Sequence, residues 1–207
     1  MADWFQIHPV NPQQRLLAQV AVRLRRGAVI AYPTDSCYAL GCQLDDREAA
    51  ERLRRIRGFD RHHRFTLVCR DLSEIATYAK VDNRQFRLIK SLTPGPYTFV
   101  LTATKELPRR IVHDKRKTVG IRVPRHVIAQ ALLETFGEPL MSCTLKFPQE
   151  ALPVGEPEEW REQLDSAVDI VVDGGPCGVD PTTVLDLSDE GVEVLRRGKG
   201  DLARIGL

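Results

Sequence analysis

The spacing of apolar residues predicts a chain in which helices and buried strands alternate. After Asn11-Pro12, an N-cap with proline in the first turn, apolar residues share one helical face until Gly27: Leu16, Leu17, Val20, Ala21 and Leu24. The run Ala28–Tyr32 is apolar, too short for a helix and ended by Pro33, as expected for a strand buried on both faces. A helix followed by a buried strand favours an α/β sheet.

A second helix is expected between a cap at Asp45 or Asp46 and a stop at Gly58, with an outer face that is almost all arginine. The same patterns predict helices over 71–79, 82–92, 126–136 and 156–165, and strands over 65–69, 97–101, 118–123, 140–143, 168–172, 183–187 and 192–195. Some strands are joined by helices and others by turns, which indicates a mixed sheet flanked by helices. No repeat or linker divides the chain, so we expect one domain over 1–207.

The composition excludes a disordered chain and a membrane protein. Of the 207 residues, 43% are hydrophobic and 28% charged, and no apolar run approaches the roughly 20 residues of a membrane-spanning helix. The opening residues lack a basic segment followed by an apolar core. We therefore expect a cytosolic protein with no membrane partner.

The cysteines and the known motifs exclude several kinds of site. Five cysteines without a Cys-x-x-Cys pair are typical of reduced thiols, and Cys37 and Cys143 fit small buried side chains better than nucleophiles. The adjacent His62 and His63 point in different directions on a regular element, so we expect no metal site. Walker, dinucleotide-binding, zinc-protease and nucleophile-elbow motifs are absent from the sequence.

The net charge of +2 hides an uneven distribution of charges. Lysine and arginine are concentrated in 52–64 and 105–125, whereas 156–193 is rich in aspartate and glutamate. Such cations can hold the phosphates of a nucleotide or of RNA through charge-assisted hydrogen bonds. The alternative is an exposed helix face on which Glu48 and Glu51 pair with Arg52 and Arg55. We favour polyanion binding, because arginines outnumber these partners and a second cluster repeats the pattern.

Five motifs, in order along nearly the whole chain, resemble those of the YrdC/YciO family, whose members include L-threonylcarbamoyladenylate synthases. They are Tyr32-Pro33-Thr34-Asp35-Ser36-Cys37-Tyr38-Ala39-Leu40-Gly41, Thr93-Pro94-Gly95-Pro96-Tyr97-Thr98, Thr118-Val119-Gly120-Ile121-Arg122-Val123-Pro124, Asp173-Gly174-Gly175 with Pro181-Thr182-Thr183-Val184, and Leu195-Arg196-Arg197-Gly198. The opening Ile7-His8-Pro9 and Asn11–Leu16, with the overall length, are most similar to the YciO branch.

The resemblance implies a YrdC-like fold: a twisted, mixed α/β (α+β) sheet with a deep, positively charged concave cleft. It also implies ATP or AMP, threonine and RNA, double-stranded or tRNA, as ligands. The family reaction joins threonine, bicarbonate and ATP into threonylcarbamoyl-adenylate and pyrophosphate, the first step of threonylcarbamoyl-adenosine formation in tRNA. Mg²⁺ accompanying ATP suits such chemistry, because charge builds on the leaving pyrophosphate. No tightly bound cofactor is expected.

The resemblance assigns ligand contacts residue by residue. Thr34 and Tyr38 would orient a small amino acid and a base, and Arg122 would pair with a carboxylate, unless it is only a charge on the sheet surface. Thr182 and Thr183 match a late polar pair, although β-propensity alone explains threonines there. The remaining expected small-molecule contacts are Arg57, Ser142, Thr144 and Arg196, and the expected RNA contacts are Arg54, Arg55, Arg61, Arg64, Lys115, Arg116 and Lys117.

Two motifs depart from those of active synthases. Where these carry Lys-x-Arg, this chain has Arg57-Gly58-Phe59, and Ser142-Cys143-Thr144 replaces their Ser-x-Asn, while Ala39 for a glycine is a smaller change. Two lost contacts, each charge-assisted bond contributing about 1.5 to 3 kcal/mol, would lower adenylation by orders of magnitude. Our leading hypothesis is therefore a nucleotide- and RNA-binding protein with weak or absent synthase activity.

Two alternatives remain open. One is a true synthase in which Arg57, Arg61 or Arg64 replaces Lys-x-Arg, although arginine and lysine are not geometrically equivalent. The other is a purely RNA- or ribosome-binding module with a degenerate pocket.

Overall fold

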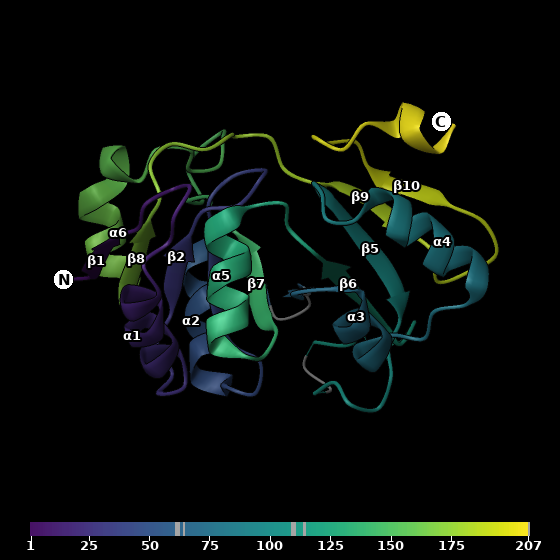
Figure 1. Cartoon of the computed structure of the whole chain (residues 1–207), viewed down its shortest axis with the longest axis horizontal. Helices are drawn as coiled ribbons and strands as arrows, with labels where there is room; N and C mark the ends of the chain where they lie inside the picture. The colour runs from purple at the N-terminus through teal and green to yellow at the C-terminus, as the bar shows by residue number, and fades with distance from the viewer. Residues whose placement is uncertain (61–62, 64, 109–110, 114, 207) are drawn as a thin grey trace.

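A computed structural model describes residues 1–60, 63, 65–108, 111–113 and 115–206, which form a single mixed α/β domain (Figure 1). Its strands are β1 Asp3–Gln6, β2 Ile30–Tyr32, β3 Ala39–Gln43, β4 Thr66–Val68, β5 Tyr97–Thr102, β6 Thr118–Arg122, β7 Leu140–Thr144, β8 Ile170–Asp173, β9 Thr183–Asp186 and β10 Glu193–Arg196. Its helices are α1 Gln14–Leu24, α2 Arg47–Arg57, α3 Leu72–Tyr78, α4 Asn83–Leu92, α5 Val127–Phe136 and α6 Arg161–Ala167, with 3₁₀ helices η1 Pro157–Trp160 and η2 Leu202–Ile205.

The ten strands form one sheet in the order β1-β8-β2-β3-β7-β4-β6-β5-β9-β10. The pairs β1–β8, β2–β8, β4–β6 and β5–β9 are parallel, and the other neighbours are antiparallel. The expected mixed sheet is thereby confirmed. No helix in the described part of the chain is both long and apolar enough to cross a membrane.

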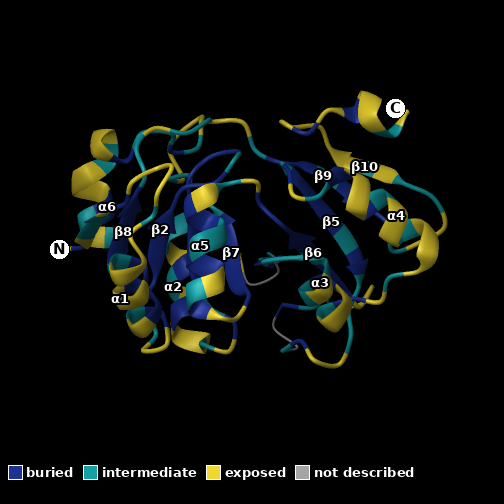
Figure 2. Cartoon of the chain, viewed as in Figure 1, coloured by how far each residue is buried: buried dark blue, intermediate teal, exposed yellow. Residues whose placement is uncertain are grey.

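The helices cover the two faces of the sheet unequally. Residues from α2, α3, α4 and α6 pack with every second residue of the strands in one core that extends along the sheet: Leu53, Ile75, Ile89 and Leu164 with Ala31, Met141, Leu67, Ile121, Phe99 and Leu185. On the opposite face, α1 and α5 cover only the half that contains β2 and β8. The buried strands and the exposed outer helix faces are visible in Figure 2. The other half of that second face carries the side chains of the candidate site.

Local capping sets the helix ends largely as expected. Asp46 caps α2 by accepting the N–H of Ala49, and Gly58 ends the helix in the left-handed conformation with φ of 63°. The expected cap at Asn11 is wrong, because α1 begins at Gln14. His8 Nδ1 accepts the N–H groups of Val10 and Asn11, which holds these residues in a turn before the helix.

Two strands were not expected from the sequence. β1 is only four residues long, and its Asp-Trp-Phe-Gln segment shows no alternation of apolar and polar residues. β3 lies within the first motif and contains glycine and alanine but no β-branched residue. Both are strands because neighbouring strands supply their backbone partners, which a local pattern does not encode.

Candidate functional site

A cleft of about 640 Å³ lies on the sheet face that the helices leave uncovered. Because side chains alternate across a strand, its floor is made by every second residue of β4, β6, β5 and β9: Thr66, Val68, Gly120, Arg122, Thr98, Val100, Val184 and Asp186. The volume is in the range of small-molecule sites. Among the described residues, the charged lysine, arginine and carboxylate side chains that line it are Arg57, Arg116, Arg122, Lys146, Arg196, Asp180 and Asp186. The cleft is therefore positively charged, as expected.

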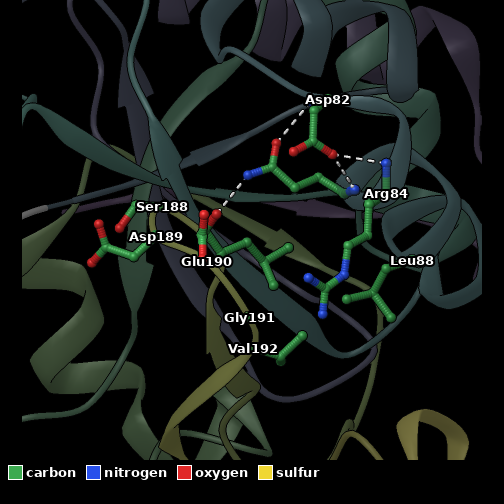
Figure 3. Close-up of a pocket in the computed structure, with 10 residues that line it drawn as sticks. Asp82, Arg84, Leu88, Ser188, Asp189, Glu190, Gly191 and Val192 are labelled. Carbon is green, nitrogen blue, oxygen red and sulfur yellow. Dashed lines mark hydrogen bonds between the residues drawn. The ribbon is translucent and has the colours of Figure 1, made fainter.

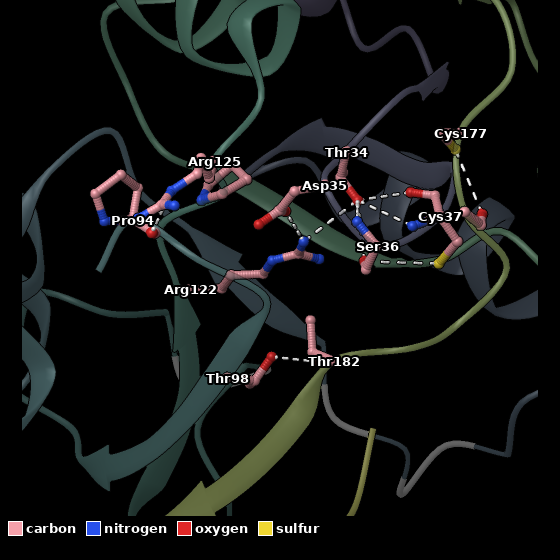
Figure 4. Close-up of polar contacts among 12 residues, drawn as sticks. Thr34, Asp35, Ser36, Cys37, Pro94, Thr98, Arg122, Arg125, Cys177 and Thr182 are labelled. Atoms are coloured by element: carbon pink, nitrogen blue, oxygen red, sulfur yellow. Dashed lines mark hydrogen bonds and ion pairs between the residues drawn. The ribbon is translucent and has the colours of Figure 1, made fainter. Parts of the chain in front are cut away.

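Arg122 ends β6 with its side chain buried beside the first motif. Its Nη2 donates to Thr34 Oγ1 over 3.3 Å and forms an ion pair with Asp35, as Figure 4 shows. Thr34 Oγ1 also accepts the N–H groups of Ser36 and Cys37, over 3.2 and 3.3 Å, which holds the turn in place. Since only 7% of Arg122 is exposed, it is not a charge on the sheet surface.

The Arg122–Asp35 pair keeps unused hydrogen-bonding capacity. Arg122 Nε and Asp35 Oδ2 are buried and have no hydrogen-bond partner among the described residues. Buried polar groups without partners are costly. A ligand with an anionic acceptor and a donor group could satisfy both atoms.

Arg196 and two threonines form the opposite side of this part of the cleft. Arg196 donates from Nε to Thr182 O and from Nη2 to Thr182 Oγ1, both over 3.0 Å. The Thr182 hydroxyl is also hydrogen-bonded to the Thr98 hydroxyl, with Oγ1 atoms 2.9 Å apart. Burial, and to a smaller extent the charge of Arg122, lowers the pKa of Arg196. An anion bound here would relieve the repulsion between the two guanidinium groups.

Arg57, at the end of α2, contributes a third cation to the cleft. It donates to the carbonyl oxygen of Lys146, and its guanidinium lies 4.5 Å from the ring centroid of Phe59. Phe59 stacks on His63 with ring centroids 3.3 Å apart. Burial lowers the pKa of Arg57, and its buried Nε has no partner among the described residues. The side chain is therefore held in place by the protein.

The segment 142–144 also lines the cleft, but its hydroxyl groups differ in availability. Ser142 Oγ donates to Leu40 O over 2.7 Å and accepts from Tyr32 Oη over 2.9 Å. Its only proton is thus used within the protein. Thr144 is partly exposed in the cleft. Burial raises the pKa of Cys143 to about 12, so its thiol is neutral and fits the expected buried, inert cysteine.

Three of the expected ligand contacts do not line the cleft: Thr34, Tyr38 and Thr183. The Tyr38 ring is buried in the core, and its hydroxyl accepts from Gly174 N over 3.1 Å and donates to Gly175 O over 2.8 Å. Thr183 donates to Gly200 O over 2.7 Å and accepts from Gly198 N over 3.0 Å. Tyr38 and Thr183 hold loops behind the cleft instead of facing a ligand.

The arginines of α2 have different environments from one another. Arg54 is 8% exposed, lies 4.8 Å from the Phe65 ring centroid and pairs with Glu51 over 2.6 Å, so it presents little surface to RNA. Arg52 pairs with Asp169 over 2.7 Å and not with a glutamate of its own helix. The alternative in which Arg52 pairs with a glutamate of its own helix is therefore wrong.

The remaining basic positions lie mostly at the surface. Arg55, Lys115 and Lys117 are exposed. Arg116 is also exposed but reaches into the cleft, where it pairs with Asp186. The expected contacts Arg61 and Arg64 lie outside the described residues.

The site residues that were missed at the sequence level include Asp35, Thr98 and Asp186. Asp35 and Thr98 stand inside motifs that resemble the family, so their polar side chains beside Thr34 and Tyr97 were the available signal. Asp186 interrupts the apolar run Val184–Leu187, and an acidic residue in a buried strand indicates a partner. Its partner Arg116 is 70 residues away, which no local pattern reveals.

Comparisons with known proteins agree with this architecture. The Sua5/YciO/YrdC family model, described as telomere recombination, matches residues 22–198. The uncharacterized protein YciO of Escherichia coli K12 is 53% identical over 202 residues, which cover 98% of each chain. The crystal structure of E. coli YciO has a TM-score of 0.94 at 52% identity, covering 99% of both chains.

More distant relatives carry an enzyme name. Threonylcarbamoyl-AMP synthase of Halorhodospira halophila is 32% identical over 168 residues, which cover 80% of this chain and 87% of that protein. The structure of P. abyssi Sua5 complexed with L-threonine, 24% identical, shares the fold with a TM-score of 0.89, covering 98% of this chain and 59% of the other. The chain therefore belongs to the Sua5/YciO/YrdC family.

Proposed function

We propose that the cleft binds a nucleotide, ATP or AMP, and catalyses threonylcarbamoyl-adenylate synthesis weakly or not at all. The observation that carries the proposal is the buried Arg122, whose Nε has no partner among the described residues, in a cleft that it shares with Arg196. Two guanidinium groups beside threonine hydroxyls form a site suited to anionic groups such as a phosphate and a carboxylate. The 32% identity to a protein named threonylcarbamoyl-AMP synthase supports the choice of nucleotide.

The mouth of the cleft suits the apolar part of a nucleotide. Leu152, Val179 and Leu195 line it while remaining 60%, 36% and 47% exposed. Exposed apolar side chains that gather at one cleft indicate a surface that a ligand covers. A base placed there would leave its phosphates above the basic floor.

Threonine is the proposed second substrate. Arg122 would bind its carboxylate, while Thr34, whose hydroxyl donates to Cys37 O over 2.6 Å and lies 3.3 Å from Arg122 Nη2, would hold that guanidinium in place. In the synthase reaction the amine of threonine condenses with bicarbonate to give a carbamate and water. An oxygen of the carbamate then attacks the phosphorus nearest the ribose, and pyrophosphate leaves. Arg57 and Arg196 would stabilise the charge on that leaving group.

Mg²⁺ is proposed to enter with ATP. The described residues contain no cluster of three or more histidine, cysteine or acidic side chains that could hold a metal ion. Mg²⁺ is commonly bound through substrate phosphates with few protein ligands, so the described residues fit a metal carried by the nucleotide.

Arg57 and Ser142 already form hydrogen bonds within the protein, which supports weak turnover. Arg57 donates to the Lys146 carbonyl, and the Ser142 proton goes to Leu40 O. Groups already bonded within the protein must give up those bonds to hold a transition state, which lowers their contribution to catalysis.

The test is pyrophosphate release with ATP, Mg²⁺, threonine and bicarbonate, together with calorimetric titration of ATP. We expect ATP binding that Arg122→Ala weakens at least tenfold, whereas Arg26→Ala, an exposed arginine outside the cleft, leaves it unchanged. Threonine-dependent turnover lost in Arg122→Ala would establish a synthase. Binding without turnover would establish a nucleotide-binding protein, and no ATP binding would contradict the proposal.

RNA binding is the second proposed function, favoured by the exposed Arg55, Lys115 and Lys117. Exposed cations bind the sugar-phosphate backbone without regard to sequence. An RNA- or ribosome-binding module without a functional pocket is the corresponding alternative. A cytosolic location stays a prediction.

A further inference from the structure

Arg116 links the floor of the cleft to an acidic turn beside it. Its Nη1 lies 3.0 Å from Asp186 Oδ2, and its Nη2 lies 3.1 Å from Asp189 Oδ2. Figure 3 shows that Asp189 and Arg84 lie on opposite sides of the neighbouring surface hollow. One guanidinium therefore joins two carboxylates of the same turn, and it also lines the cleft.

The two halves of this contact differ in their exposure to solvent. The Asp186 side chain is 3% exposed and also accepts the N–H and hydroxyl of Ser188. The Asp189 side chain is 82% exposed, and that of Arg116 is 47% exposed. Exposed ion pairs contribute little and exchange with other partners, whereas a buried carboxylate keeps its partner. Asp186 thus fixes Arg116, while Asp189 holds its second amine only weakly.

The sheet register places this contact close to the proposed phosphate site. Val184 of β9 pairs with both Thr98 and Arg196, and Asp186 lies two residues further along the same strand. Two strand residues span roughly 7 Å. A single phosphate held beside Arg196 would therefore not reach Arg116, but a chain of linked phosphates extending along the strand would.

We propose that Asp189 is an internal competitor for the phosphate chain of a nucleoside triphosphate. The inference rests on the proposed nucleotide site. On binding, an outer phosphate takes the place of the Asp189 carboxylate at Arg116 Nη2, while Asp186 keeps the guanidinium in position. A phosphate oxygen and a carboxylate oxygen accept the same charge-assisted hydrogen bond. Because only a chain of phosphates reaches Arg116, this contact makes the cleft bind a triphosphate more tightly than a monophosphate. Competition by the Asp189 carboxylate reduces that difference in affinity.

The test compares the affinities of ATP and AMP by calorimetry, without threonine or bicarbonate, in the wild type, Asp189→Asn and Glu190→Gln. Glu190 is the matched control because it is the next exposed residue with the same charge, while Arg116 binds Asp189. We expect Asp189→Asn to raise the ATP affinity about two- to fivefold, the range of an exposed ion pair. AMP affinity should change less, and Glu190→Gln should have a clearly smaller effect on both.

A double-mutant cycle isolates the contact. Arg116→Gln should lower ATP affinity about tenfold, and AMP affinity much less. In the Arg116→Gln background, Asp189→Asn should no longer raise ATP affinity.

Each contrary result has a distinct meaning. Equal gains from Asp189→Asn and Glu190→Gln, or equal gains for ATP and AMP, would reduce the effect to net charge and overturn the inference while leaving the proposed nucleotide site intact. A gain confined to an RNA duplex titrated in parallel would assign Arg116 to RNA and overturn the exchange. If neither the wild type nor Asp189→Asn bound either nucleotide, the proposed function and this inference would fail together.

Discussion

At the residue scale, the most consequential contact is the one between Arg122 and Asp35. Their side chains are only 9% and 12% exposed, and the two residues stand 87 positions apart in the chain. The protein thus supplies its own carboxylate to an arginine that the sequence suggested for a ligand's carboxylate. Arg122 Nε and Asp35 Oδ2 remain without partners among the described residues, so the pair does not use all of its hydrogen-bonding capacity.

We predict that Asp35→Ala lowers the free energy of unfolding by about 3 kcal/mol, because it leaves a buried guanidinium without its counter-charge. Urea unfolding monitored by circular dichroism measures this. The matched control is Asp3→Ala, since Asp3 pairs with Arg23 where the side chains are 58% and 41% exposed. Asp3→Ala should lower the free energy of unfolding by less than about 1 kcal/mol. Similar small losses in both variants would show that the Arg122–Asp35 pair is not a buried interaction in solution.

At the element scale, side-chain caps explain why helix boundaries were predictable. Asp82 accepts from the N–H groups of Arg84 and Gln85, and the Gln85 side chain accepts from the N–H of Asp82, forming a capping box at α4. At α3, Asp71 accepts from the N–H groups of Ser73 and Glu74, over 2.8 and 3.0 Å. These contacts join residues two or three positions apart, so the sequence pattern contains them.

The cap of α3 gives a prediction about pH. The N–H of Glu74, with smaller contributions from Arg70 and Ser73, lowers the pKa of Asp71 in the folded protein. A carboxyl group with a lowered folded pKa stabilises the fold above its unfolded pKa of about 3.9, and this stabilisation is lost as pH falls through the folded pKa. Asp71→Ala should therefore lower the free energy of unfolding by about 1 kcal/mol near neutral pH.

Urea unfolding of wild type and Asp71→Ala across the acid range measures this effect. The difference between them should shrink as pH falls below about 3.9. The control is Glu150→Gln, which removes an exposed carboxylate from a loop. Its free energy of unfolding should stay close to that of the wild type at every pH. A constant difference between wild type and Asp71→Ala would contradict the assignment of the effect to the ionised carboxylate.

At the scale of the whole molecule, uneven coverage of the sheet creates the functional surface. One face is covered along its length by α2, α3, α4 and α6, and the other face is covered by α1 and α5 over one half only. The uncovered half becomes the basic cleft, into which the exposed Arg116 reaches. The positive charge of the cleft is therefore a property of the assembled sheet, to which several segments contribute.

We predict that affinity for an RNA duplex falls steeply with salt, with a log–log slope of about −0.7 to −0.9 per phosphate contacted, because binding releases counterions. The double variant Lys115→Gln with Lys117→Gln should reduce the slope by about 2, one for each lost contact. Lys90→Gln, on α4 and away from the cleft, is the control. Fluorescence anisotropy across a salt series measures the slopes, and an unchanged slope in the double variant would remove these lysines from the RNA surface.

The sequence by itself determined the features that depend on near neighbours. Apolar spacing located the helices and most strands, and Asp46, Gly58, Asp71 and Asp82 marked helix ends, because caps and amphipathic faces act over a few residues. Motif order identified the family fold and placed Arg122 and Arg196 in the cleft. The strands β1 and β3 were not predicted, because their sequences are weakly patterned and neighbouring strands supply their backbone partners.

Only the tertiary structure decided which charged and polar side chains face a ligand. Arg54 is buried against Phe65, Tyr38 anchors the glycine loop, and Arg116 is held by Asp186, although similar residues in the same segments are exposed. Pairs such as Arg52–Asp169, 117 residues apart, form because strand order brings distant segments together. The physical reason is that burial and counter-charge depend on the packing of the whole sheet, whereas caps and periodicity depend on a single turn or strand.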